Sequence, residues 1–335
     1  MRDPVVGDRF DQYQLTELLA RSGMASIFKA KDTLSGEWVA LKIPHIQYES
    51  DVVFSERFRR EEEVGQRLSH PNIVRILKPV EKSRMYLAME FVEGKSLRSL
   101  MRAKEPFQVE RALDIARQVC DALAYLHDEG VVHRDIKPEN ILVAENGRLK
   151  ILDFGIALFA SERRLTWTGL SSTIGTPDYM APEQIRGRRG DPRTDVYALG
   201  MMLYEMLTCN LPFDSPNPRA LLKAKTSAEP RPPSYYVPNF DPSLEAIILK
   251  AIERDPRDRY HSARQLLKDL ENPQAVAPRD PETGRARRRV RAQSRRRALL
   301  ALAAAAVLLF LLTLIHLSAR SAPAGAPPPG AGRSR

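Results

Sequence analysis

The hydrophobic pattern of the first 93 residues predicts short strands around one helix. An apolar run surrounds a single lysine at 38–43 (WVALKI), and a second strand-like run covers 85–92. Between them, residues 56–68 are dense in Glu and Arg. Phe58, Val64 and Leu68 recur there at helical spacing, and the pattern stops at His70. This part of the chain is expected to form a small β-rich lobe.

From residue 96 to residue 270 the pattern becomes predominantly helical. Apolar faces with a helical period cover 112–126, 196–207 and 244–252. The sequence thus predicts an α+β domain at 10–271, with an N-lobe at 10–93 and a larger helical C-lobe at 94–271. Residues 272–297 are expected to be a linker followed by a basic segment, because Pro and polar residues open this stretch and arginines fill its second half.

Residues 298–317 predict a transmembrane helix. This stretch of 20 residues contains no Asp, Glu, Lys or Arg, and at 1.5 Å per residue it matches a hydrocarbon core of about 30 Å. The alternative is a buried core helix. The flanks argue against it, because arginines precede the stretch and a short Pro/Ala/Gly-rich tail at 318–335 follows it. Ala301 and Ala305 form a small-xxx-small pair that permits weak self-association into a homodimer, against the alternative of a plain anchor.

The net charge of +10 comes from the same end of the chain. Eight arginines lie at 285–297 and three in the tail, so the remainder carries a charge of −1. No aromatic residues are interleaved with these arginines, so nucleic-acid binding is not indicated. Anionic membrane lipids are the expected partners of the basic segment. The excess of arginine before the span predicts a single-pass protein of the cell membrane, with the domain in the cytoplasm and the tail outside.

The most informative residues lie at 133–140 (HRDIKPEN) and 153–155 (DFG). Phosphoryl transfer needs a carboxylate that accepts the proton of the attacking hydroxyl, together with hard oxygen ligands for Mg²⁺. Asp135, Asn140 and Asp153 supply these groups at the spacing found in protein kinases. Over residues 10–271 the sequence resembles the eukaryotic-type (Hanks-type) serine/threonine protein kinases of bacteria. This resemblance implies the two-lobed protein-kinase fold.

The resemblance also implies roles for individual residues. Asp135 corresponds to the catalytic base and Lys137 to the cation that meets the transferred phosphoryl group, while Asn140 and Asp153 would hold Mg²⁺. Lys42 resembles the lysine that contacts the α- and β-phosphates of ATP. Its partner should be a glutamate of the Glu/Arg-rich helix. The best match is Glu61, with Glu62 and Glu63 as close alternatives.

A second set of positions corresponds to the nucleotide pocket. Met89 occupies the place of the residue behind the adenine, and residues 90–92 occupy the hinge. The positions implied to line this pocket are Ile27, Ala40, Met89, Glu90 and Val92.

The glycine-rich loop departs from the family pattern. Residues 20–27 read ARSGMASI, with Ala20, Ser22 and Ala25 in place of three glycines and only Gly23 remaining. Glycine lets backbone N–H groups approach a phosphate without interference from a Cβ atom. The alternative function is therefore a membrane-tethered pseudokinase scaffold with impaired ATP binding.

Downstream, residues 175–183 (GTPDYMAPE) resemble the substrate-docking end of a kinase activation segment. Asp195 corresponds to the aspartate that braces the catalytic loop, and Arg259 to the arginine that pairs with Glu183. Thr176 and Lys137 together favour serine/threonine specificity. With the domain in the cytoplasm, the expected substrates are cytosolic proteins and the chain itself. The candidate autophosphorylation sites are Thr166, Thr168, Ser171, Ser172 and Thr173.

Overall fold

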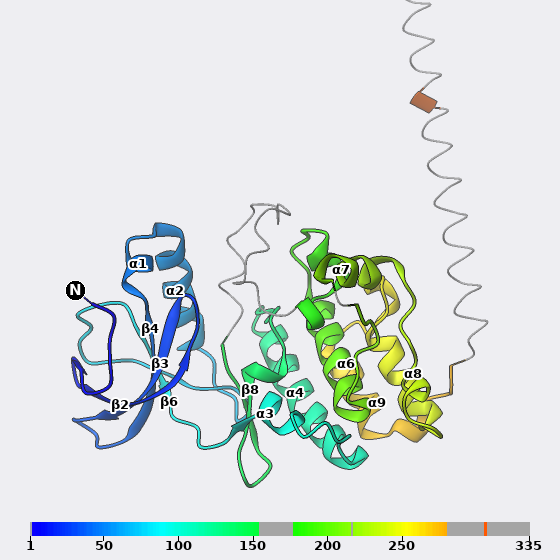
Figure 1. Ribbon diagram of the computed structural model, residues 1–335, viewed down its shortest axis with the longest axis horizontal. Coiled ribbons are helices and arrows are strands. Elements are labelled where there is room, and N and C mark those ends of the chain that lie inside the picture. The colour runs from blue at the N-terminus through cyan, green and yellow to red at the C-terminus, as the bar shows by residue number, and fades with distance from the viewer. Residues whose placement is uncertain (1, 154–176, 216, 280–304, 307–335) are drawn as a thin grey trace, which may run out of the picture. The chain divides into compact units, whose positions relative to one another are not determined.

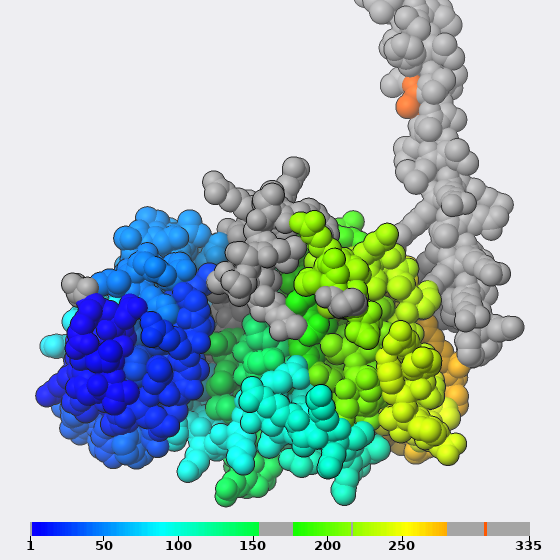
Figure 2. All heavy atoms as spheres, in the orientation of Figure 1, coloured from blue at the N-terminus to red at the C-terminus, as the bar shows by residue number. Residues whose placement is uncertain are grey.

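The computed structural model describes residues 2–153, 177–215, 217–279 and 305–306. Met1–Pro278 form one compact unit, and Arg279–Arg335 are assigned to a second. Within the first unit, a β-sheet lies at the N-terminal end, and helices dominate the part that follows (Figure 1). The space-filling view shows these two parts side by side, the N-terminal part mainly in blue and the part that follows in cyan to yellow (Figure 2). The two-lobed α+β arrangement predicted from the sequence is confirmed.

The N-lobe is built on an antiparallel sheet of six strands in the order β1-β2-β3-β4-β6-β5. The strands are β1 (Arg9–Phe10), β2 (Tyr13–Arg21), β3 (Ala25–Asp32), β4 (Trp38–Pro44), β5 (Ile76–Leu77) and β6 (Leu87–Glu90). The apolar run at 85–92 thus pairs as a strand only over its central part. Alternation along β4 places Val39, Leu41 and Ile43 in one hydrophobic cluster, whereas Ala40 and Lys42 face the opposite side of the sheet.

One long helix packs with this sheet. It is α2 (Val52–Gly65), preceded by the short α1 (Ile46–Glu49). The prediction of a helix at 56–68 was wrong at both ends. The helix starts earlier because the side chain of Asp51 accepts a hydrogen bond from the backbone N–H of Phe54 at 3.1 Å, which caps the first turn. Phe58 is the apolar anchor of α2 in the hydrophobic cluster that also contains Ala40.

The C-lobe is organised around two buried helices, α4 (Val109–Asp128) and α6 (Pro192–Thr208). Both lie in the main hydrophobic cluster, and α4 packs against α6 and α9 (Figure 1). The predicted helical faces at 112–126 and 196–207 lie in α4 and α6, and the face at 244–252 lies in α8 except for its last residue, which is the C-cap. The other α-helices and strands of the described residues are α3 (Leu97–Met101), α5 (Pro182–Ile185), α7 (Pro218–Ser227), α8 (Pro242–Ala251), α9 (Ala263–Glu271), β7 (Lys95–Ser96), β8 (Ile141–Val143) and β9 (Leu149–Ile151).

In the part of the chain that the structure describes, no helix has both the length and the apolar character needed to cross a bilayer. The span predicted at 298–317 lies outside the described residues except for residues 305 and 306, which are helical and exposed. The anchor therefore stays a prediction from the sequence.

A buried ion pair ties α5 to the end of the C-lobe. The guanidinium of Arg259 donates to both carboxylate oxygens of Glu183 at 2.7 Å, and the two side chains are 0% and 7% exposed. Thr194 Oγ1 donates to the same carboxylate at 2.9 Å, and Arg259 Nε donates to the carbonyl oxygen of Glu253 at 2.7 Å. The pair expected from the sequence is thus present, and it is fully hydrogen-bonded.

We predict that Arg259→Ala lowers the free energy of unfolding by about 3–5 kcal/mol, because the substitution leaves the Glu183 carboxylate buried without its cation. Chemical denaturation monitored by fluorescence measures this change. Arg257→Ala is the matched control, since Arg257 is an exposed arginine two residues away that pairs with Asp255, and it should leave stability unchanged. Equal stability of the two variants would contradict this account of the pair.

Candidate active site

Lys42 joins three elements of the structure. Its Nζ lies 2.9 Å from Oε1 of Glu61 on α2 and 2.7 Å from Oδ1 of Asp153, which follows β9. In the sheet, Lys42 is paired with Ile27 and Ala40 with Met89. Side chains of directly paired residues share one face of a sheet. The lysine and the apolar pocket positions Ile27, Ala40 and Met89 therefore lie on the same face of the N-lobe sheet.

The structure distinguishes among the three glutamates that the sequence left open. Glu61 is 3% exposed and contacts Lys42. Glu62 pairs instead with Lys82, and Glu63 is exposed. Successive residues of a helix point about 100° apart, so only one of three adjacent glutamates can face the sheet.

The ionisation of this cluster is set by burial and by charge. Burial alone would lower the pKa of Lys42, but the carboxylates of Asp153 and Glu61 outweigh it and raise the pKa well above its usual value. Burial likewise acts to raise the pKa of Asp153, yet the neighbouring Lys42 ammonium holds it below its usual range. Near neutral pH the lysine is therefore protonated and Asp153 is ionised.

The catalytic-loop residues gather around the Asp135 carboxylate. Lys137 Nζ lies 2.6 Å from Asp135 Oδ2, and Nδ2 of Asn140 donates to the same oxygen at 3.0 Å and to the Asp135 carbonyl at 2.9 Å. The backbone N–H of Leu152 donates to the Asn140 carbonyl at 2.8 Å. Because Leu152 directly precedes Asp153, this bond holds the two predicted metal-binding residues next to each other.

A carboxylate buried in α6 fixes the backbone of the catalytic loop. Asp195 is 0% exposed and accepts hydrogen bonds from the backbone N–H groups of His133 at 2.9 Å and Arg134 at 2.6 Å. Its Oδ2 also lies 2.8 Å from His127 Nε2. Arg134 has a φ of 65°, in the left-handed region that non-glycine residues seldom occupy. The two bonds to Asp195 stabilise this conformation, which directly precedes Asp135.

Asn140 and Asp153 are suited to bind a Mg²⁺ ion that is also coordinated by the phosphates of a nucleotide. Asn140 uses its Nδ2 group on Asp135, so its side-chain oxygen is the atom that can bind a metal ion, and Asp153 adds a carboxylate. Magnesium in phosphate-transfer sites is bound by one or two carboxylates plus phosphate oxygens. Among the described residues, no group of three or more His, Cys, Asp and Glu side chains is placed to hold a metal ion by itself.

The loop between β2 and β3 is closed by a serine side chain, a feature that the sequence analysis missed. Oγ of Ser22 accepts hydrogen bonds from the backbone N–H groups of Ala25 at 3.1 Å and Met24 at 3.3 Å, and it donates to the Ala25 carbonyl at 3.0 Å. Serine hydroxyls commonly close turns in this way, so a serine at a glycine position was the available signal. The two N–H groups thus already have an acceptor within the loop.

The alanines of this loop cost no backbone strain. Ala20 lies at the end of β2 and Ala25 at the start of β3, and neither has a positive φ. A glycine at either position would have no conformational advantage over alanine there. The departure that matters chemically is Ser22.

The side chain of the hinge residue Glu90 lies on the face of the sheet opposite to the pocket positions, because Glu90 is paired with Val39. Its Oε1 accepts from Lys150 Nζ at 2.5 Å and from the backbone N–H of Arg75 at 2.9 Å. Val92 is partly buried against the same hydrophobic cluster as Ile27 and Met89. The structure thus brings Ile27, Ala40, Lys42 and Met89 together on one face of the N-lobe sheet, whereas the side chain of Glu90 lies on the other face.

The predicted docking segment is described from Pro177 onward. It forms a single 3₁₀ turn, Pro177–Tyr179, followed by α5. Gln184 of α5 accepts a hydrogen bond from the backbone N–H of Ala181 and donates to the carbonyl oxygen of Arg134, both at 2.9 Å. The segment is thereby tied to the catalytic loop. The candidate phosphorylation sites at 166–173, and Thr176, lie outside the described residues.

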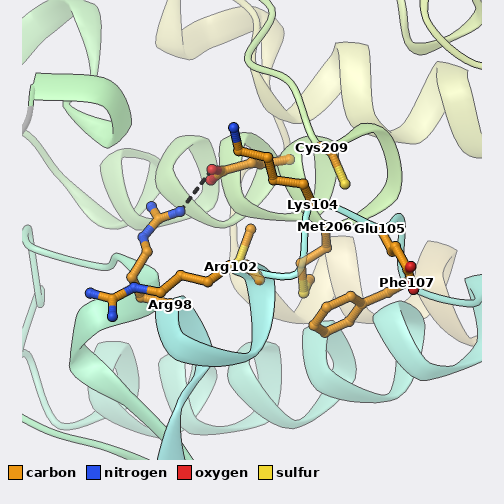
Figure 3. Close-up of a pocket in the computed structure, with 9 residues that line it drawn as sticks. Arg98, Arg102, Lys104, Glu105, Phe107, Met206 and Cys209 are labelled. Atoms are coloured by element: carbon orange, nitrogen blue, oxygen red, sulfur yellow. Dashed lines mark hydrogen bonds and ion pairs between the residues drawn. The ribbon is translucent and has the colours of Figure 1, made fainter.

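A separate cavity of about 260 Å³ lies between α3 and the end of α6 (Figure 3). Its lining residues are Arg98, Met101, Arg102, Lys104, Glu105, Phe107, Glu205, Met206 and Cys209. Arg98 donates to Glu205 and to Glu139, each at 2.8 Å, and also to the hydroxyl of Tyr179 in the docking segment. None of the residues around Asp135 lines this cavity. Arg98, which does line it, supports the docking segment from the α3 side.

Comparisons with known proteins agree with this geometry. Residues 13–270 match the protein kinase domain family. The serine/threonine-protein kinase PrkC of Bacillus subtilis is 38% identical over 268 residues, which cover 79% of this chain and 41% of PrkC. The serine/threonine-protein kinase PknB of Mycobacterium tuberculosis is 35% identical over 265 residues, which cover 78% of this chain and 42% of PknB. This chain thus spans about two fifths of the length of these curated relatives.

Among solved structures, the kinase domain of Mycobacterium tuberculosis PknI superposes with a TM-score of 0.63 at 26% sequence identity, covering 81% of this chain and 100% of that domain. The matched region contains Lys42, Glu61, Asp135, Asn140 and Asp153. The chain therefore belongs to the protein kinase family, and the relatives described are bacterial kinases of the Hanks type that its motifs resemble.

Proposed function

We propose that this chain is a serine/threonine protein kinase that transfers the γ-phosphoryl group of ATP to hydroxyls of cytosolic proteins and of itself. The observation that carries this proposal is that candidate site residues of the two lobes are joined by direct contacts. Lys42 of the N-lobe contacts Asp153 at 2.7 Å, and the bond between Leu152 and Asn140 links Asp153 to the loop that carries Asp135. The names of the relatives support the choice of serine and threonine as acceptors.

Each residue of the site has a defined part in this reaction. Asp135 orients the attacking hydroxyl and accepts its proton, while Lys137, 2.6 Å from that carboxylate, offsets negative charge at the point of transfer. Asn140 and Asp153 would hold Mg²⁺, and Lys42 would contact the phosphates. When bound, ATP and Mg²⁺ supply the transferable phosphoryl group and neutralise its charge.

Modification of the activation segment forms part of this proposal. Arg134 precedes the catalytic aspartate, and an arginine in this position can pair with a phosphorylated residue through charge-assisted hydrogen bonds. Thr166 and Thr168 are the first candidates.

The C-terminal part of the chain adds a membrane location. Residues 298–317 would span the cell membrane once, the arginines at 285–297 would contact anionic lipids, and the kinase domain would face the cytoplasm. Ala301 and Ala305 would allow weak dimerisation of the span. The composition of the sequence supports these proposals.

The kinase activity is tested by incubating the purified full chain with labelled ATP and Mg²⁺. We expect phosphoserine or phosphothreonine, which mass spectrometry should locate between residues 153 and 183. Asp135→Asn should lower the rate by about 10²–10⁴-fold, because it removes a positioned general base. Asp214→Asn, at an exposed aspartate, is the matched control and should retain activity. A wild-type chain that is inert at saturating ATP would instead support the pseudokinase alternative.

Ser22→Gly should lower the KM for ATP about threefold to tenfold, since it releases the N–H groups of Met24 and Ala25 for phosphate binding. The kcat should change by less than about tenfold, because this loop contributes mainly to binding. Ser35→Gly is the control, since Ser35 is an exposed serine whose Oγ accepts from the backbone N–H of Glu37 at 3.2 Å in a turn between β3 and β4. A higher KM in Ser22→Gly would show that the hydroxyl assists nucleotide binding.

Membrane attachment is tested by fractionating cells that express the full chain. We expect the chain to sediment with membranes, and a variant lacking residues 298–317 to become soluble. Protease added outside intact spheroplasts should leave the kinase domain uncut, whereas detergent should expose it to digestion. Digestion of the domain in intact spheroplasts would reverse the proposed orientation.

A further inference from the structure

Lys225 is a lysine in the interior of the C-lobe. It lies on α7 and is 1% exposed, whereas Lys223 on the same helix is exposed. An ammonium group is costly to bury unless hydrogen bonds replace its hydration. If this side chain had only to fill space in the interior, methionine or leucine would do so at a lower free-energy cost. The buried amino group therefore indicates a specific task.

The amino group of Lys225 contacts the main chain of the docking segment and lies near an aromatic ring of α6. Nζ donates to the carbonyl oxygen of Pro177 at 3.0 Å and also to that of Asp178. It lies 5.4 Å from the ring centroid of Tyr197 on α6. Burial lowers the pKa of Lys225 to about 7, although the negative charge of Asp178 opposes this shift. The hydrogen-bond acceptors are thus neutral main-chain groups that are distant in sequence.

The docking segment needs such support because its own structure is minimal. Pro177–Tyr179 form one 3₁₀ turn, closed by the backbone bond from the N–H of Met180 to the carbonyl of Pro177 at 3.2 Å. A single turn of this kind is not stable alone. Arg98 holds the hydroxyl of Tyr179 from α3, and Gln184 connects the far end to the catalytic loop. Lys225 holds the main chain at the near end.

We propose that Lys225 is a positioning residue for the protein substrate, which acts by holding the carbonyl groups of Pro177 and Asp178 so that the docking segment presents the acceptor hydroxyl to Asp135. This inference rests on the proposed kinase function and deepens it. It assigns to α7, which carries none of the catalytic motifs, a direct effect on substrate binding. Substrate affinity should therefore depend on Lys225, while nucleotide affinity should not.

The test compares Lys225→Met, which keeps the length of the side chain but removes its donors, with Lys223→Met on the exposed face of the same helix. A synthetic peptide copied from residues 160–175 of this chain serves as the substrate. For Lys225→Met we expect the KM for the peptide to rise about tenfold, as for the loss of one buried hydrogen-bonding group, with the KM for ATP unchanged. Lys223→Met should match the wild type in both constants.

Hydrogen–deuterium exchange of the full chain provides a second readout that does not depend on activity. Lys225→Met should increase exchange at the N–H groups of residues 178–180 and leave α4 and α6 protected. Wild-type values for both the peptide KM and the local exchange would overturn the inference. A rise in both KM values with faster exchange throughout the C-lobe would also overturn it, by showing a general packing role. An inert wild-type chain would refute the proposed function, and the exchange measurement would still decide whether Lys225 holds the segment.

Discussion

The site depends on one interaction, the protonated Lys42 held between the carboxylates of Glu61 and Asp153 at 2.9 and 2.7 Å. Each partner comes from a different part of the fold: strand β4, helix α2 and the segment after β9. Glu61 is buried, and burial raises the pKa of its carboxyl group, an effect that the neighbouring Lys42 ammonium opposes. The orientation of α2 and the position of Asp153 relative to the N-lobe sheet are therefore coupled through a single ammonium group.

The C-lobe supplies the rigid base for the chemistry. Asp195 projects from α6, a helix whose residues are almost all buried, and holds the main chain of His133 and Arg134. From Arg134 the connections run through Gln184 to α5 and the docking segment. Helices packed in a core deform little, so carboxylates and carbonyls attached to them stay in place. Helix α6 thus supports the catalytic loop and, through Gln184, the docking segment. The buried ion pair of Glu183 and Arg259 holds α5 in the C-lobe.

The fold and the main site could be predicted from sequence to the extent that local patterns determine them. Apolar runs and helical patterns identified two strands of the sheet and the helices α4, α6 and α8, and the spacing from Asp135 to Asp153 indicated the reaction. The choice among Glu61, Glu62 and Glu63 needed the rotation of α2 relative to β4, which no local pattern gives. A serine at a glycine position was the only signal for the turn that Ser22 closes. The role of Lys225 was missed because main-chain acceptors carry no sequence signature. Lys225 reaches them across 47 and 48 residues.

The central claim is that Asp153 and Asn140, placed by Lys42 and by the catalytic loop, bind Mg²⁺ together with ATP. Calorimetric titration of ATP into the purified full chain, with Mg²⁺ and with EDTA, tests this claim most directly. Mg²⁺ should tighten ATP binding by about tenfold or more in the wild type, and Asp153→Asn should abolish this gain. Equal affinity with and without Mg²⁺, or an undiminished gain in Asp153→Asn, would contradict the account.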